Sequence, residues 1–380
     1  MFCNLKKLIN PRKYRVRVII WCLCGILSLH IAFAEQIVVQ KSFSSIVGEK
    51  DSIAQQSIDK RIGVNLPDDV EILMYASAMG QTKTVKALLA DKRIDPNLQD
   101  NNGMTSLMMA SFEGHPSTVK VLLSDKRVDP NLQDNNGMTS LVVASVKGHP
   151  VTVKVLLADK RVDPNLQDNN GATSLMRASL VGHPSTVKAL LADKRVDPNL
   201  QDNNGATSLM RASLAGHPSV VKALLSDKRV DPNLQDNKGM TSLMMASVKG
   251  HPDTAKALLS DKRVDPNLKN DLGWTSLVFA SGAGHLDIVK ALIDDERISP
   301  NLQDNGSREA LTVAVASGHL EIVKVLLASN KIKMDMQDDA VRAAYKMASD
   351  RGDIEMAELL SNFSTPQVSQ IQVYSFKDEL

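Results

Sequence analysis

A unit of 34 residues recurs through most of this 380-residue chain and limits its possible folds more than any other feature. One clear copy, from Asn101 to Asp134, reads NNGMTSLMMASFEGHPSTVKVLLSDKRVDPNLQD. The glycine before its His-Pro pair returns at every step of 34 residues, as Gly80, Gly114, Gly148, Gly182, Gly216, Gly250, Gly284, Gly318 and Gly352. Self-similarity at a fixed period of this size predicts an array of stacked structural units.

The repeat array changes the number of domains that we expect for a chain of this length. Length alone suggests about two or three globular domains, but a unit in a repeat array contacts only its neighbours. We therefore expect one elongated domain of nine units over residues 67–361. The predicted units cover residues 67–100, 101–134, 135–168, 169–202, 203–236, 237–270, 271–304, 305–338 and 339–361.

Each unit carries the signals of a turn followed by a short helix. In the second copy, Gly103 ends the polar run QDNNG, which is typical of a tight turn with a positive φ angle. Thr105 precedes an apolar run and suits the N-cap of a helix, in which Leu107 and Ala110 follow at helical spacing. This first helix is expected to end at Gly114.

A second helix is expected to follow the His-Pro pair. Pro116 suits the first helical position, and Val119 and Leu122 provide one buried face. The helix is expected to stop before Asp129 and Pro130, because the residue before a proline disfavours the helical conformation. Neither helix is long enough to be stable alone, so stability must come from stacking one unit on the next.

The unit resembles an ankyrin repeat, which is a β-turn followed by two antiparallel helices and whose pattern includes T-P-L-H-x-A. The constant positions that carry the resemblance are, in the second copy, Gly103, Thr105, Leu107, Ala110, Gly114, His115, Val119, Leu122, Leu123 and Asn131. The resemblance implies an all-α solenoid of helix-turn-helix units joined by β-turn or hairpin loops, elongated and curved.

The unit departs from the ankyrin pattern in two places. TPLH has become TSLM or TSLV, so Ser106 replaces the proline and Met108 or Val142 replaces the histidine. One residue is inserted after the second helix, in SDKRVDPN, which makes the period 34 rather than the family's 33. The resemblance therefore predicts the end of the second helix less well than the rest of the unit.

The charge pattern argues against nucleic acid as a partner. The formal net charge is +2, and in the second copy the basic and acidic residues balance. These residues are Lys120, Lys126 and Arg127 against Asp125, Asp129 and Asp134. We therefore expect no basic stripe that faces phosphates.

No catalytic, metal or cofactor site is expected. The three cysteines, Cys3, Cys22 and Cys24, all lie near the N-terminus and would be lost with a cleaved leader. Seven of the eight histidines recur once per unit, too far apart, at about 10 Å, to share a metal ion. We interpret them as turn residues that cap the second helix, and Asp129 and Asp134 as solvated turn residues. The sequence thus predicts a protein that is not an enzyme and holds no cofactor or metal.

The N-terminal residues have the order of a secretory signal peptide. Residues 1–34 contain a basic segment, an apolar run from Val18 to Ala34 and small residues before Glu35. The alternative is an uncleaved membrane anchor, because the basic segment is long and the apolar run is close to spanning length. Residues 35–66 are predicted to be a polar leader arm. Membrane contact is expected only if the leader stays uncleaved.

The C-terminal residues 362–380 are predicted to be a flexible tail that carries a retrieval signal. The tail ends in Lys377, Asp378, Glu379 and Leu380, the tetrapeptide that returns luminal proteins to the endoplasmic reticulum. We expect a secreted or exported protein, with two alternatives: a resident of the endoplasmic reticulum lumen, or a protein that an intracellular bacterium directs at its host. The long basic leader and the nearly identical copies favour the second.

The positions at which the copies differ are the candidates for binding. The resemblance implies that such positions line a concave face, formed by turns and first helices, where ankyrin-like repeats bind partners. The predicted partner-binding residues are Met104, Phe112, Met138, Arg177, Leu180, Arg211, Leu214, Met240 and Trp274. The alternative is that such side chains pack against the next copy, which we favour for Met108, Met244 and Val278. The two arginines either bind an acidic group of the partner or lay their stems on neighbouring residues.

The sequence therefore predicts a non-enzymatic, exported scaffold that binds a partner protein through the concave face. The identity of that partner stays open, and a host-directed effector is one form of the prediction. A resident scaffold of the endoplasmic reticulum lumen is an alternative. A structural spacer without a specific partner is the other, expected if the apolar positions prove to be buried.

Overall fold

The computed structural model describes residues 66–306, 309–329, 331–332 and 339–364. The chain divides into two compact units, Met1–Ile72 and Leu73–Leu380, and the stack described below belongs to the second. The predicted signal peptide, all but the last residue of the predicted leader arm, and the retrieval tetrapeptide Lys377–Leu380 lie outside the described residues.

The described residues form eighteen helices and no strand, so the predicted all-α fold is confirmed. The first helices of the pairs are α3 (Leu66–Ala78), α5 (Ser106–Phe112), α7 (Ser140–Lys147), α9 (Ser174–Val181), α11 (Ser208–Ala215), α13 (Ser242–Lys249), α15 (Ser276–Ala283), α17 (Ala310–Ser317) and α19 (Asp339–Asp350). The second helices are α4 (Thr82–Ala90), α6 (Pro116–Ser124), α8 (Pro150–Ala158), α10 (Pro184–Leu191), α12 (Pro218–Leu225), α14 (Pro252–Leu259), α16 (Leu286–Asp294), α18 (Leu320–Ala328) and α20 (Ile354–Ser364). The last helix runs three residues into the predicted tail.

The predicted turn is confirmed before the first helices from α5 to α15, at Gly103, Gly137, Gly171, Gly205, Gly239 and Gly273. Gly103 has a φ angle of 79° and donates its N–H to the carbonyl oxygen of Asp100 at 2.9 Å. Asp100 in turn donates to the carbonyl oxygen of Met104 at 3.0 Å. A Cβ atom on Gly103 would lie 2.7 Å from the backbone nitrogen of Asn135 in the next unit. Glycine is thus required here both by the backbone conformation and by the close approach of the next turn.

The predicted helix starts are confirmed as well. The side-chain oxygen of Thr105 accepts a hydrogen bond from the backbone N–H of Met108 at 3.2 Å, as an N-cap residue does. Pro116 occupies the first turn of α6, where its missing N–H leaves no donor unpaired. The second helix ends with Asp125 as its C-cap, earlier than the Asp-Pro pair alone required.

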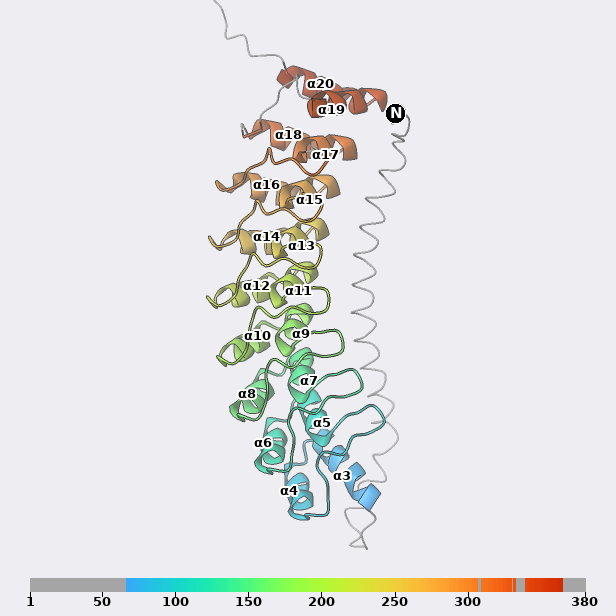
Figure 1. Cartoon of the computed structure of the whole chain (residues 1–380), viewed down its shortest axis with the longest axis vertical. Helices are drawn as coiled ribbons and strands as arrows, with labels where there is room; N and C mark the ends of the chain where they lie inside the picture. Colours follow the sequence, from blue (N-terminus) through green and yellow to red (C-terminus); the bar gives the residue numbers. More distant parts are fainter. Residues whose placement is uncertain (1–65, 307–308, 330, 333–338, 365–380) are drawn as a thin grey trace, which may run out of the picture. The chain divides into compact units, whose positions relative to one another are not determined.

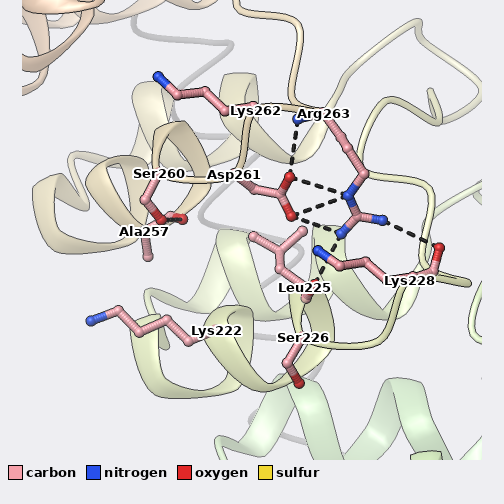
Figure 2. A pocket seen from close by; sticks show the side chains of 9 residues that line it. All are labelled: Lys222, Leu225, Ser226, Lys228, Ala257, Ser260, Asp261, Lys262 and Arg263. Atoms are coloured by element: carbon pink, nitrogen blue, oxygen red, sulfur yellow. Dashed lines mark hydrogen bonds and ion pairs between the residues drawn. The ribbon is translucent and has the colours of Figure 1, made fainter.

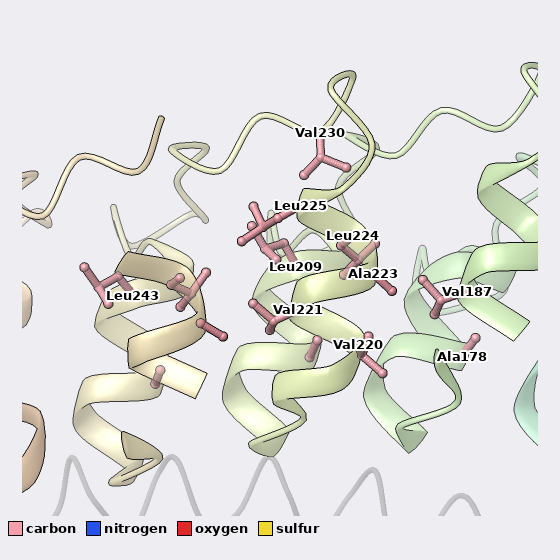
Figure 3. Close-up of a cluster of buried hydrophobic side chains, with 14 of the residues drawn as sticks. Ala178, Val187, Leu209, Val220, Val221, Ala223, Leu224, Leu225, Val230 and Leu243 are labelled. Atoms are coloured by element: carbon pink, nitrogen blue, oxygen red, sulfur yellow. The ribbon is translucent and has the colours of Figure 1, made fainter. Parts of the chain in front are cut away.

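The helix pairs stack through a continuous hydrophobic cluster. In Figure 1 the helices α5 to α17 follow one another in one row and α6 to α18 in another. From α5 to α19 each first helix contacts the next first helix, and from α4 to α20 each second helix contacts the next second helix. Figure 3 shows part of the cluster, with Val187, Leu224 and Leu243 coming from three successive units. Burying such a side chain stabilises the fold by about 1.5–3 kcal/mol.

The residue inserted after the second helix forms part of an arginine bridge between units. The guanidinium group of Arg263 is bonded to Asp261 in its own unit, with Nη2 2.7 Å from Oδ2 (Figure 2). The same group donates to the carbonyl oxygens of Leu225 at 2.9 Å and Val230 at 2.7 Å, both in the preceding unit. The same arrangement recurs at Arg127, Arg161, Arg195, Arg229 and Arg297.

Candidate protein-binding face

The histidines of the repeated His-Pro pair join neighbouring units. His251 is the N-cap residue of α14, but its side chain makes no capping hydrogen bond. Its Nε2 atom lies 3.1 Å from the carbonyl oxygen of Leu214 in the preceding unit, so Nε2 must carry the proton and donate. Burial lowers the pKa of His251, which favours this neutral form. The histidines thus stand at the N-cap positions, as we interpreted them, but their rings bond to the preceding unit and not to the helix that they begin.

The carbonyl groups that accept from these histidines belong to residues whose side chains differ from unit to unit. The acceptors are the carbonyl oxygens of Ala78, Phe112, Val146, Leu180, Leu214, Val248 and Gly282. The backbone at this position is thus held by one repeated hydrogen bond, while the side chain differs from unit to unit. Val146, Leu180, Leu214 and Val248 are each half-buried.

The aspartate of each turn is more buried than its sequence context predicted. Asp134 is buried, and its Oδ1 atom accepts from the backbone N–H groups of Asn136 at 2.9 Å and Met138 at 2.7 Å. Burial raises the pKa of Asp134. Our interpretation of Asp134 as a solvated turn residue was wrong, because the turn carries the carboxylate inward onto its own backbone.

Two of these aspartates bind the predicted partner-binding arginines. Arg177 Nη2 lies 2.7 Å from Oδ2 of Asp168, whose side chain is fully buried. Arg211 forms the equivalent ion pair with Asp202. The acidic group that one of our two alternatives assigned to a partner is therefore supplied by the chain itself, and each arginine fixes the turn before its own helix. The signal in the sequence was a spacing of nine residues from aspartate to arginine, which only these two pairs satisfy among the turns that the structure describes.

A second hydrophobic cluster, which we name the methionine cluster, lies on helices α11, α13 and α15 and the turns before them. Its buried members are Ala206, Met210, Met240, Met244, Met245 and Phe279. The sulfur atoms of Met210 and Met244 accept weak hydrogen bonds, at 3.5 Å, from the backbone N–H groups of Thr207 and Thr241. At the position of the family's histidine, methionine therefore both packs and supports the helix start.

Trp274 lies at the edge of the methionine cluster. Its ring meets the ring of Phe279 edge to face, with the ring centroids 5.1 Å apart. Its Nε1 atom donates to Oδ2 of Asp304, in the turn before α17, at 2.8 Å. Trp274 thus links the turn before α15 to the turn before α17, in addition to the partner contact that we predicted for it.

The predicted partner-binding residues divide by exposure. Met104, Phe112, Met138 and Met240 are only 8%, 6%, 8% and 7% exposed and offer little surface to a partner. Leu180, Leu214 and Trp274 are half-buried, as are Arg177 and Arg211. Met108, Met244 and Val278, for which we favoured packing, are fully buried. The apolar residues of this set that reach the surface are therefore Leu180, Leu214 and Trp274.

The described residues hold no group of three or more histidine, cysteine or acidic side chains placed to bind a metal ion. None of the described helices combines the length and the apolar character needed to cross a membrane.

The comparison with known protein families agrees with the observed helix pairs. A family model described as ankyrin repeats, in three copies, matches residues 45–134, 73–168, 109–202, 175–270 and 243–338. A search of curated proteins found no match to this chain. The repeats support a protein–protein interaction scaffold, since binding other proteins is the usual work of this family. Because the overlapping matches span residues 45–338, well over half of the sequence, this chain belongs to the ankyrin-repeat family.

Proposed function

We propose that this chain is a non-enzymatic scaffold that binds a partner protein through the C-terminal turns of its first helices. We name this surface the variable face and define it by Val146, Lys147, Leu180, Val181, Leu214, Ala215, Val248 and Lys249. These residues end helices α7, α9, α11 and α13, which contact one another in that order.

The observation that carries the proposal is that the backbone at this position is held in the same way in successive units, whereas the side chain differs between them. The carbonyl oxygens of Val146, Leu180, Leu214 and Val248 each accept the same inter-unit histidine hydrogen bond. The four side chains differ between units and are only half-buried, although Leu214 and Val248 also pack against the methionine cluster. Units that are nearly identical elsewhere but differ at such positions form a surface whose side chains can be selected for binding a partner.

The variable face has an apolar centre between two basic ends. Leu180 and Leu214 occupy the centre, whereas Lys147 and Lys249 occupy the outer units. Lys147 Nζ lies 4.1 Å from the centre of the Phe112 ring, which holds this ammonium group beside the face. Apolar anchors in the middle of a polar rim are the usual arrangement of a protein interface. The partner that fits best presents an apolar side chain flanked by acidic groups.

The test compares capture of partner proteins by three forms of the full chain. The double variant Leu180→Glu with Leu214→Glu places two charges at the apolar centre. Val151→Glu is the matched control, because Val151 is exposed on α8 and lies outside the variable face. We expect proteins that bind the wild type and the control to be lost with the double variant, while helical circular dichroism is retained. Equal capture by all three forms rules out the variable face.

Export is part of the proposal and rests on residues 1–34 and 377–380, which lie outside the described residues. Residence in the endoplasmic reticulum lumen is the second candidate. It needs the retrieval signal at Lys377–Leu380 to work, as does a host-directed protein that the tail would address to host membranes. Intact protein and protein without Leu380 should therefore localise differently in a eukaryotic cell. If both forms distribute alike, the tetrapeptide has no role.

A further inference from the structure

The second helices carry a regular row of exposed lysines that the variable face does not use. One lysine lies in each of the second helices α6, α8, α10 and α12, at Lys120, Lys154, Lys188 and Lys222. A second follows six residues later in each unit, from Lys126 to Lys228. All eight are exposed, and none makes an ion pair in the part of the chain that the structure describes. We name these eight residues the lysine strip.

Hollows lie between units along this surface. One of about 460 Å³ is bordered by Lys222 and Lys228 of the strip and by Lys262 of the next unit. Figure 2 shows Lys222 and Lys262 extending to the same side of the Asp261–Arg263 pair. A second hollow, of about 540 Å³, is bordered by Lys86, Lys92 and Lys126. The same chemistry therefore recurs at both ends of the strip.

The acidic residue within each hollow is already neutralised. Hydrogen bonds from Arg263 hold the pKa of Asp261 below its usual value, and those from Arg127 hold the pKa of Asp125 at about 2. Each hollow contains three lysines and one arginine against this single aspartate, a net charge of 4 − 1 = +3. In the second hollow Lys92 also lies 3.8 Å from Oδ2 of Asp125. The lysines of the strip itself make no such ion pair in the part of the chain that the structure describes, so their charges are left for a ligand.

The excess of positive charge is confined to one part of the stack. Helices α4, α6, α8, α10 and α12 contain lysine and no acidic residue. Acidic residues enter the first turns of the later second helices, at Asp253, Asp287 and Glu321. In unit 271–304 the second lysine of the pair is replaced by Glu296. Basic and acidic residues balance within a single unit, but they do not balance on this surface. The acidic residues of the unit lie on other surfaces or are bound to arginine.

We propose that the lysine strip binds an acidic polypeptide segment in an extended conformation. Packed helices lie about 8–10 Å apart, and three residues of a polyproline II segment rise about 9.3 Å. An acidic side chain at every third residue therefore meets one unit after another. Electrostatic complementarity of this kind mainly speeds association and selects the partner, and salt weakens it.

Two other classes of anionic partner fit the surface less well. Single-stranded nucleic acid binds by stacking on aromatic side chains, and helices α4 to α12 of the second row contain none. A membrane surface or a nucleic-acid duplex is wide, and would also approach the exposed aspartates of the neighbouring loops, such as Asp163 and Asp197.

The test uses the full chain and a fluorescent peptide of repeated Glu-Pro-Pro triplets. The strip variant is Lys154→Glu with Lys188→Glu, and the control is Lys290→Glu with Lys346→Glu, an equal charge change on α16 and α19 outside the strip. We expect fluorescence anisotropy to show binding by the wild type and the control, and a loss of about tenfold or more in affinity for the strip variant. Added salt should weaken the binding of the wild type.

Three results would overturn the proposal. They are no binding of the peptide at low salt, equal binding by the two variants, and tighter binding of a single-stranded oligonucleotide or of phosphatidylserine vesicles than of the peptide. Because the lysine strip and the variable face involve different helices, this proposal and the proposed function can fail independently.

Discussion

Arg263 donates a hydrogen bond from Nη2 to the carbonyl oxygen of Leu225, 2.9 Å away at the end of helix α12 in the preceding unit. The last carbonyl groups of a helix have no partner within the helix, so a donor from the next unit satisfies one of them. In unit 305–338 Lys331 takes this place and donates to the carbonyl oxygen of Ile293 at 2.7 Å. The inserted segment that distinguishes this repeat therefore joins consecutive units.

The arginine bridge predicts a large loss of stability for Arg263→Ala. The change removes charged hydrogen bonds to Leu225 and Val230 and leaves Asp261 without its partner. We expect the free energy of unfolding to fall by about 2 kcal/mol or more, measured by urea denaturation. Lys262→Ala, at the neighbouring exposed residue, should change it by less than about 0.5 kcal/mol. Equal effects of the two variants would contradict the bridge.

The close packing of the histidine ring on a glycine predicts that a glycine-to-alanine substitution lowers stability by different amounts at two positions. Gly216 and Gly318 have similar φ angles of 75° and 77°. A Cβ atom on Gly216 would lie 2.6 Å from Nδ1 of His251, whereas one on Gly318 would meet only Arg351, at 4.0 Å. Gly318→Ala should cost about 1–2 kcal/mol from backbone strain alone, and Gly216→Ala about 1–3 kcal/mol more. Thermal unfolding of both variants measures the difference, and similar melting temperatures would exclude the close contact.

A buried hydroxyl without a partner predicts a stabilising substitution. Among the described residues, no hydrogen-bond partner lies near Oγ1 of Thr186, which is fully buried. Val220 occupies the same position in the next unit and is also buried. Thr186→Val should therefore raise the free energy of unfolding by about 1 kcal/mol.

The control for this substitution is Thr118→Val. Thr118 is equally buried, but its Oγ1 atom lies 2.9 Å from Oγ1 of Thr82, so the change breaks a hydrogen bond. Chemical denaturation should show that this variant gains no stability. A gain of the same size in both variants would mean that the hydroxyl's lack of a partner is not the cause.

The buried turn carboxylate predicts a dependence of stability on pH. Burial raises the pKa of Asp134, so its contribution to stability is complete below the unfolded pKa of about 3.9 and is lost as pH rises through the higher folded pKa. Asp134→Asn removes this loss. Asn270 stands at the equivalent position and accepts the same two kinds of backbone hydrogen bond, at 3.0 Å and 2.9 Å. We expect the variant to be more stable than the wild type at pH 7.

Melting temperatures measured from about pH 3 to about pH 7 test this prediction. The difference between Asp134→Asn and the wild type should shrink as the pH falls toward the unfolded pKa. The same substitution at the exposed Asp129 controls for the loss of one negative charge. A variant that is less stable than the wild type at neutral pH would contradict the prediction.

The features of the fold that lie within one unit could be predicted from the sequence. The turn at Gly103, the N-cap at Thr105 and the start of α6 at Pro116 each depend on local backbone preferences, which the residues themselves reveal. The repeat period then supplied the stacking, because short helices with one apolar face have no other way to be buried.

The features that lie between units could not be predicted in the same way. The pairing of His251 with Leu214 depends on the position of one unit over the next. The burial of Met104 likewise depends on packing that no single unit contains. For this reason the sequence indicated which positions vary, while their exposure and their usefulness for binding required the structure.

Hydrogen exchange of the full chain, with and without a captured partner, tests the central claim most directly. The claim is that the constant residues build the stack and the variable face binds. Amide protection on binding should appear in the C-terminal turns of α7, α9, α11 and α13, around Leu180 and Leu214, with the second helices unchanged. Protection confined to the second helices, with none around Leu180 and Leu214, would contradict it.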